Sequence, residues 1–354
     1  MKEERDIVYL SLPFTAAVAA GTLMSPSYGA AAVSAAILFF TLGYFILRKP
    51  RSAAAYAFLM FACGLFCSLT GGLAVLSDAG SAPAWQLALR ARLAGAVDAL
   101  PFTGDGTAAL VKALALGDRT SLAPAVTGVF RASGASHILA LSGMHLGIFY
   151  MCLSWLMAPL GKSPVARKVK SVVIILLSAV YVVVAGASAS LVRALIFIIL
   201  RESAQLLHRR ISLLRILLAA LMIQLMLSPG EIASAGFQLS YLAVAGIALV
   251  FPWLEALYPS GGRLDFTRKI WQLCALSISC QLFTAPVAWA RFGSFPKYFL
   301  LSNLLAIPPA TILTATSIAI VLLAPFGLCP AFLLHLADFA SSLLTSLLTT
   351  ISEM

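Results

Sequence analysis

The stretch ASHILALSGMHLGIFY, from Ala135 to Tyr150, places two histidines, two serines and two glycines in an otherwise apolar sequence. The segment is apolar enough to lie in a lipid bilayer, where a polar group without a partner costs free energy. We therefore expect it to belong to a membrane span. We also expect the pair Ser142-Gly143 to interrupt the helix, so that the polar groups around it serve a function.

The whole chain shares this apolar character. It is 61% hydrophobic and only 10% charged, and its mean hydropathy is +0.99. An ordinary soluble domain is roughly 25% charged, so that class is excluded. Apolar runs of about 18 residues, each long enough to cross a bilayer, recur along the chain. The pattern predicts an all-α polytopic transmembrane bundle of about eleven spans, some broken or re-entrant, with short amphipathic surface helices.

The predicted spans alternate with basic loops. They cover residues 8–24, 28–47, 53–76, 135–158, 169–187, 190–207, 211–228, 234–257, 269–290, 298–324 and 330–351. If the N-terminus is cytoplasmic, the Lys and Arg clusters near residues 48–51, 162–170, 209–215 and 263–269 all fall on the cytoplasmic side, as the positive-inside rule requires. We expect a multi-pass protein of the bacterial inner membrane with an extracytoplasmic C-terminus. No small-residue cleavage site follows the first span, so we expect no removed signal peptide.

The net charge of +11 has two interpretations. It could attract a polyanion such as nucleic acid. Alternatively, it reflects only the basic cytoplasmic loops of a membrane protein, and we assign most of the charge to that cause.

The chain divides into three predicted regions. Residues 1–76 form N-terminal transmembrane helices, residues 77–134 form extracytoplasmic amphipathic helices, and residues 135–354 form the membrane core. The middle region is too polar to span, but Trp85, Leu89 and Leu93 recur at helical spacing. We expect short helices on the membrane surface. An amphipathic linker packed on the other helices is an equal alternative.

Polar residues next to helix breakers occur at five places in the predicted core. A charged side chain at the centre of a span costs roughly 2.5–3.5 kcal/mol even on lenient scales, so each place is a functional candidate. Broken helices line the binding sites of transporters and channels. The alternative is hydrogen bonding between helices within the bundle. The candidate lining residues are His137, Ser142, His145, Ser188, Arg193, Gln238, Ser240, Gln281, Arg291 and Asn303.

Catalysis has little support in the sequence. Ser142 and His145 could suggest a hydrolase, but no G-x-S-x-G elbow is present and the aspartates lie mostly outside the spans. Asp338, the exception, is expected to pair locally with His335. The six cysteines form no zinc-type cluster. We expect no catalytic residue, no bound metal, no cofactor and no disulfide framework.

Several motifs in order resemble the ComEC family of competence proteins. They are ALALGDRTSL, FRASGASHILALSGMHLG, GASASLVRALI, GFQLSYLAVAGI, PVAWARFGSF and LSNLLAIPP, which together cover about residues 110–310. Fuller family members carry an OB-like domain and a metallo-β-lactamase-like nuclease domain. Only a short connector stands in the place of the first, and the chain contains no His-x-His-x-Asp-His cluster. The resemblance therefore covers the membrane core alone, and we expect no enzyme activity.

This resemblance implies a channel for single-stranded DNA entering the cytoplasm during natural transformation. Its implied partners are single-stranded DNA, membrane lipid, and separate nuclease and ATP-driven translocation proteins; a homo-oligomer is left open. In this interpretation Arg193 and Arg291 offer positive charge to phosphate. Two alternatives stand beside it: a permease for a small or anionic solute, and a non-conducting membrane scaffold.

Overall fold

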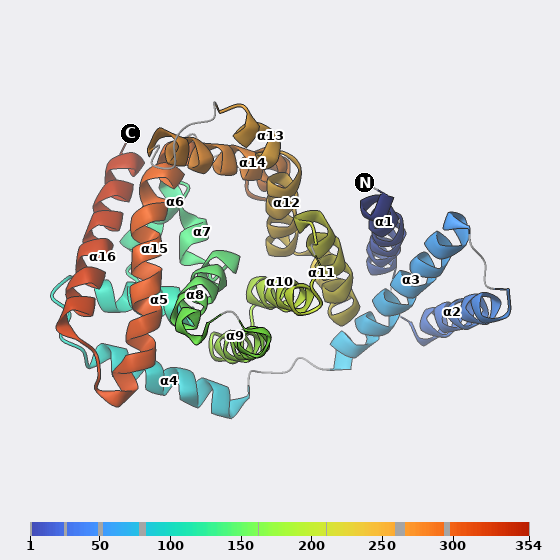
Figure 1. The fold of residues 1–354 in the computed structure, drawn as a ribbon, viewed down its shortest axis with the longest axis horizontal. Helices are drawn as coiled ribbons and strands as arrows, with labels where there is room; N and C mark the ends of the chain where they lie inside the picture. The colour runs from blue at the N-terminus through green and yellow to red at the C-terminus, as the bar shows by residue number, and fades with distance from the viewer. Residues whose placement is uncertain are drawn as a thin grey trace.

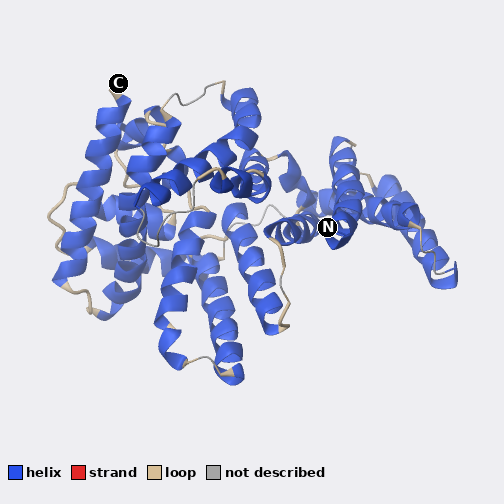
Figure 2. Cartoon of the chain, turned by 45° about the horizontal axis from the view of Figure 1, so that its top comes forward, coloured by secondary structure: helices blue, strands red, loops and turns tan. Residues whose placement is uncertain are grey.

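The computed structural model describes residues 2–24, 27–48, 52–77, 83–161, 163–209, 211–258, 266–293 and 298–353. These residues form helices joined by loops, with no strand among them (Figure 2). The predicted all-α class is confirmed.

The chain begins with three long helices, of which α3 packs against both α1 and α2; α1 and α3 also contact α11 and the turn η2 (Figure 1). Four helices, α4 to α7, follow, and then the helices α8 to α16. The α-helices are α1 (Lys2–Leu23), α2 (Tyr28–Arg48), α3 (Ala53–Ser77), α4 (Ala84–Asp98), α5 (Thr107–Leu116), α6 (Pro124–Ala132), α7 (Ser136–Leu139), α8 (Gly143–Leu156), α9 (Pro164–Val184), α10 (Ala189–Leu206), α11 (Leu213–Leu227), α12 (Ala235–Leu249), α13 (Phe251–Ala256), α14 (Phe266–Phe292), α15 (Phe299–Leu323) and α16 (Ala331–Ser352). The 3-10 turns are η1 (Ala158–Leu160), η2 (Pro229–Ala233) and η3 (Ala324–Phe326).

Six of the described helices are long and apolar enough to cross a bilayer, which identifies a membrane protein. These segments are Asp6–Leu23, Ala53–Gly71, Ala235–Ala256, Phe266–Phe292, Phe299–Phe326 and Ala331–Ser352. By contrast, α8 has 14 residues and α11 has 15. At 1.5 Å per residue they are about 21 to 23 Å long, short of the roughly 30 Å of hydrocarbon in a bilayer. The predicted number of about eleven spans is not confirmed.

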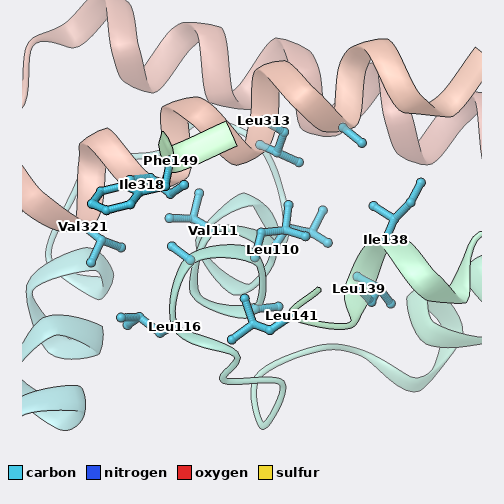
Figure 3. Packing of buried hydrophobic residues seen from close by; sticks show 14 of the residues in the cluster. Leu110, Val111, Leu116, Ile138, Leu139, Leu141, Phe149, Leu313, Ile318 and Val321 are labelled. Atoms are coloured by element: carbon cyan, nitrogen blue, oxygen red, sulfur yellow. The ribbon is translucent and has the colours of Figure 1, made fainter. Parts of the chain in front are cut away.

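The main hydrophobic core surrounds α5. Eight of its ten residues are buried, from Thr107 and then from Leu110 to Leu116. Leu110, Val111 and Leu116 face apolar side chains from α7, α8 and α15 (Figure 3). For α5 this finding matches the alternative of a segment packed on other helices, whereas α4 and α6 of the same region each have at most two buried residues. Small alanines allow this close packing, because they leave room for neighbouring helices to approach.

Serine N-caps set the starts of most core helices. In each case the side-chain oxygen accepts a hydrogen bond from a backbone N–H of the first turn, which satisfies a donor that lacks a partner within the helix. The capping serines are Ser142 (α8), Ser163 (α9), Ser188 (α10), Ser212 (α11) and Ser234 (α12). These caps explain why the apolar sequence divides into separate helices at these points.

The predicted helix breaks occur only in part. The chain is extended at Ala140 and Ser142, and it turns at Gly186 between α9 and α10, where φ is positive. In contrast, α14 continues through Pro286 and α15 continues through Pro308 and Pro309. A proline removes one backbone donor but does not by itself end a long helix in a membrane protein.

A cavity lined by arginine and tyrosine in the membrane core

A cavity of about 560 Å³ lies between α8, α10, α11 and α12. Its walls combine two arginines with small, hydroxylated and apolar residues. The lining residues are Gly143, Gly147, Tyr150, Ser190, Arg193, Ala194, Phe197, Ile198, Arg201, Ile211, Leu213, Ile216, Ser240 and Val244. Glycines in the first turns of α8 leave this part of the wall without side chains. A methyl group at Gly147 would meet nothing within 4 Å.

Arg193 lies one turn into α10 and is almost fully buried, with 3% of its surface exposed. Its Nη2 donates to the hydroxyl of Ser190 at 3.1 Å, and its guanidinium lies 5.1 Å from the centre of the Tyr241 ring. Its Nη1 has no hydrogen-bond partner among the described residues. The guanidinium thus keeps one buried N–H donor without a partner, on a side chain that contributes to the cavity wall.

The Tyr241 ring is itself fixed in place. Its hydroxyl donates to Oε1 of Gln224 on α11 at 2.9 Å. The amide nitrogen of Gln224 donates in turn to the backbone carbonyl of Ala189 at 3.3 Å. This chain of hydrogen bonds connects α12, α11 and the first residue of α10, and so holds the surface on which Arg193 rests.

A second arginine–tyrosine pair lies two turns further along α10. The guanidinium of Arg201 lies 5.4 Å from the centre of the Tyr150 ring on α8. The Tyr150 hydroxyl donates to Oε1 of the buried Glu202 at 2.7 Å, and Ser171 on α9 donates to Oε2 at 2.6 Å. Desolvation makes a buried carboxylate costly unless such hydrogen bonds are made. The two hydroxyls therefore stabilise Glu202 and position Tyr150.

The cavity carries an excess of positive charge. Among the described residues, the ion pairs are Lys112–Asp98 and Arg268–Glu255, and neither involves a residue of the cavity wall. The guanidiniums of Arg193 and Arg201 are held by aromatic rings rather than by acids. Guanidinium groups with free N–H donors bind phosphate or carboxylate well, because the planar fork matches two oxygens.

Two of the ten lining residues predicted from the sequence, Arg193 and Ser240, lie on this cavity. Ser142 and His145 lie beside it and form a capping box instead: the Ser142 backbone N–H donates to Nδ1 of His145 at 3.2 Å. His145 is completely buried, and its Nε2 has no partner among the described residues. His137 lies on α7 and is exposed.

The remaining predicted residues are spread over the bundle. Ser188 caps α10, and the amide of Gln238 donates to the carbonyl of Ile232 at 2.9 Å. Exposed Arg291 donates to the carbonyl of Ala233 at 3.0 Å. Gln281 on α14 and Asn303 on α15 are partly exposed. The structure does not bring these five residues together at the cavity.

Three residues of this site were not predicted: Tyr150, Arg201 and Glu202. A signal for two of them was present, because Arg201 and Glu202 are charged residues inside a predicted span at 190–207. No helix breaker stands next to them, so the search for polar residues beside helix breakers did not select them.

The structure also corrects the expectation for Asp338. This residue accepts hydrogen bonds from the Thr103 backbone N–H, the Thr103 hydroxyl and the Gly104 N–H, at 2.9, 2.7 and 3.1 Å, rather than forming the local pair expected with His335.

Comparison with known proteins identifies relatives of this core. The family model described as Competence protein matches residues 114–354. ComE operon protein 3 of Bacillus subtilis (strain 168) is 27% identical over 199 residues, which cover 56% of this chain and 24% of that protein. The uncharacterized protein YcaI of Escherichia coli (strain K12) is 23% identical over 210 residues, 58% of this chain and 28% of that protein. The chain thus matches about a quarter of each relative's length. No solved structure matches the chain.

Proposed function

This chain belongs to the Competence protein family, and we propose that its membrane core forms a channel through which single-stranded DNA enters the cytoplasm during natural transformation. The relative named ComE operon protein 3 supports a place in DNA uptake. The ComEC resemblance of the sequence motifs points to the same step.

The observation that carries this proposal is the environment of Arg193. This arginine is buried and one of its N–H donors has no partner among the described residues. Because such a group destabilises the fold, we infer that it serves the function. Phosphate of a passing strand supplies the missing acceptor. Because a conducting site must release its ligand, a few arginines held by aromatic rings suit passage better than a dense basic cluster.

The proposal extends to the surroundings of the core. The chain lies in the inner membrane with its N-terminus cytoplasmic and its C-terminus outside, as the positive-inside pattern indicates. The nuclease and the ATP-driven motor are separate proteins, and this chain performs no enzymatic step. Its matched relatives are several times longer than the matched region, so activities of their other parts are not carried over.

A small-anion permease is the second candidate, and the size of the cavity favours it. The cavity of about 560 Å³ lies within the range of roughly 300–1,000 Å³ that is usual for small-molecule sites. Such a permease would use the same two arginines to bind one anionic solute. It would transport that solute in cells that take up no DNA.

Variants of Arg193 in the host test the channel. Arg193→Gln removes the charge, Arg193→Lys keeps it, and Arg92→Gln removes an exposed arginine on α4 as the control. We expect Arg193→Gln to lower recombinant formation by about 10- to 100-fold at normal protein level, which corresponds to the loss of one charged hydrogen bond. Arg193→Lys should lower it less and Arg92→Gln not at all. Normal recombination in Arg193→Gln cells would contradict the proposal.

A further inference from the structure

Arg193, Phe197 and Arg201 occupy positions i, i+4 and i+8 of α10, and all three line the same cavity. At 1.5 Å per residue, the two arginines are separated by about 12 Å along the helix axis. Phe197 lies between them and is partly exposed. The helix therefore presents two positive charges with an aromatic ring in the middle.

Both arginines are held in the same manner. Arg193 rests on Tyr241 of α12, and Arg201 rests on Tyr150 of α8. Each tyrosine hydroxyl donates to a buried side chain, Gln224 in the first case and Glu202 in the second. Stacking on a ring uses only the face of a guanidinium, so the N–H groups at its edge are not consumed by the ring. In Arg193 one of these groups donates to Ser190 and Nη1 has no partner among the described residues.

Part of the cavity lining is apolar. It includes Ile211, Leu213 and Ile216, before and in the first turns of α11. Together with Phe197, these residues favour a flat, weakly polar group in the same cavity as the two arginines. A nucleobase has this character, and stacking of a base on an aromatic side chain contributes about 1–3 kcal/mol without regard to sequence.

We propose that Arg193, Phe197 and Arg201 form a ladder that binds two phosphates of a single strand, with a base between them stacked on Phe197. This inference rests on the proposed function and names the contacts that the strand makes. Phosphates follow one another at about 3.4 Å along the axis of a duplex strand, and a free strand can extend further, so about 12 Å spans a few nucleotides. The ladder binds any sequence, because it contacts phosphates and the face of a base.

The test measures binding of two labelled oligonucleotides to the purified full-length chain in lipid nanodiscs, by fluorescence anisotropy at several salt concentrations. One probe is a short oligothymidylate, and the other is the same sugar–phosphate chain without bases. The variants are Arg201→Gln, Arg201→Lys and Phe197→Leu, with Arg92→Gln as the matched control. Arg201 and Arg92 are exposed, so both glutamine variants are expected to fold.

We expect Arg201→Gln to weaken binding of both probes about 10-fold and to reduce the slope of log affinity against log salt by about 0.7, the value for one phosphate contact of a single strand. Arg201→Lys should restore the slope. Phe197→Leu should weaken only the probe that has bases, by at least about 5-fold. Arg92→Gln should leave both affinities unchanged.

Three results would contradict the ladder or a part of it, and they differ in what they imply. If the unmodified protein binds both probes and neither Arg201→Gln nor Phe197→Leu changes the affinities, the ladder is wrong and the channel proposal is untouched. If the unmodified protein binds neither probe at low salt, the ladder fails together with the channel proposal. Equal weakening of both probes by Phe197→Leu would refute the stacking of a base.

Discussion

The Tyr150 hydroxyl on α8 donates a hydrogen bond of 2.7 Å to the buried carboxylate of Glu202 on α10, and Ser171 on α9 donates to the other oxygen of the same carboxylate. One acidic side chain therefore connects three helices of the core. It also sets the position of the tyrosine ring against which Arg201 lies. Glu202 therefore contributes both to the packing of these helices and to the position of a tyrosine in the candidate site.

Glu202→Ala tests that coupling. Removal of the carboxylate leaves the buried Ser171 hydroxyl and the half-buried Tyr150 hydroxyl without acceptors, so we expect the unfolding free energy to fall by about 1–3 kcal/mol. Glu202→Gln keeps one acceptor and should be milder. Thermal unfolding in detergent measures both, with Glu353→Gln at the exposed end of α16 as the control. An unchanged melting temperature in Glu202→Ala would show that the carboxylate does not hold the three helices.

Asp338→Ala should detach the loop before α5 from α16. The carboxylate accepts three hydrogen bonds from Thr103 and Gly104. Bonds to a charged acceptor contribute about 1.5–3 kcal/mol each, although they are not additive. Limited proteolysis near residues 99–106 should become faster in Asp338→Ala. Asp105→Asn, a change in an exposed residue of the same loop, is the control and should leave the rate unchanged. Equal cleavage in the two variants would contradict this anchor.

His145→Gln separates capping from a role in the pathway. Glutamine at the third position of a helix serves a capping box as histidine does here, so we expect stability close to that of the unmodified protein. His145→Ala should lose about 0.5–2 kcal/mol by analogy with other lost caps. Because His145 is fully buried, transformation should persist in His145→Gln cells. A loss of transformation at normal stability would instead assign the imidazole a direct part in passage.

Gly246→Ala tests the close approach of α12 to α14. A methyl group at Gly246 would collide with the backbone carbonyl of Ser279, whereas one at Gly236 on the same helix would meet nothing within 4 Å. We expect Gly246→Ala to lower the melting temperature and Gly236→Ala to preserve it, since alanine otherwise favours a helix over glycine. If both variants melt alike, the two helices are less tightly packed than the structure indicates.

Much of the fold could be predicted from local sequence. The hydrophobic runs predicted the helical class, and Ser142-Gly143 and Gly186 marked real interruptions. Pro286 did not interrupt α14, because the loss of one backbone bond does not by itself end a long helix. The buried position of α5 was not evident either, since a short alanine-rich segment has similar patterns on a membrane surface and inside a bundle.

The site was less predictable than the fold. Arg193 and Ser240 were found because each lies near a helix start with a glycine or serine close by. Tyr150 and Glu202 are 52 residues apart in sequence, and their contact depends on how α8 packs against α10. One sequence contains no signal for such pairings, so the two arginine–tyrosine pairs could be recognised only in three dimensions.

The most direct test of the channel is deletion of the gene in its native host, followed by exposure of the cells to labelled linear DNA. DNA held outside the cytoplasm and recombinants formed are measured in the same culture. We predict that external DNA accumulates as before while recombinants disappear, and that the intact gene restores them. Recombinants at the normal rate in the deletion strain would contradict the account and would leave the small-anion permease as the function to pursue.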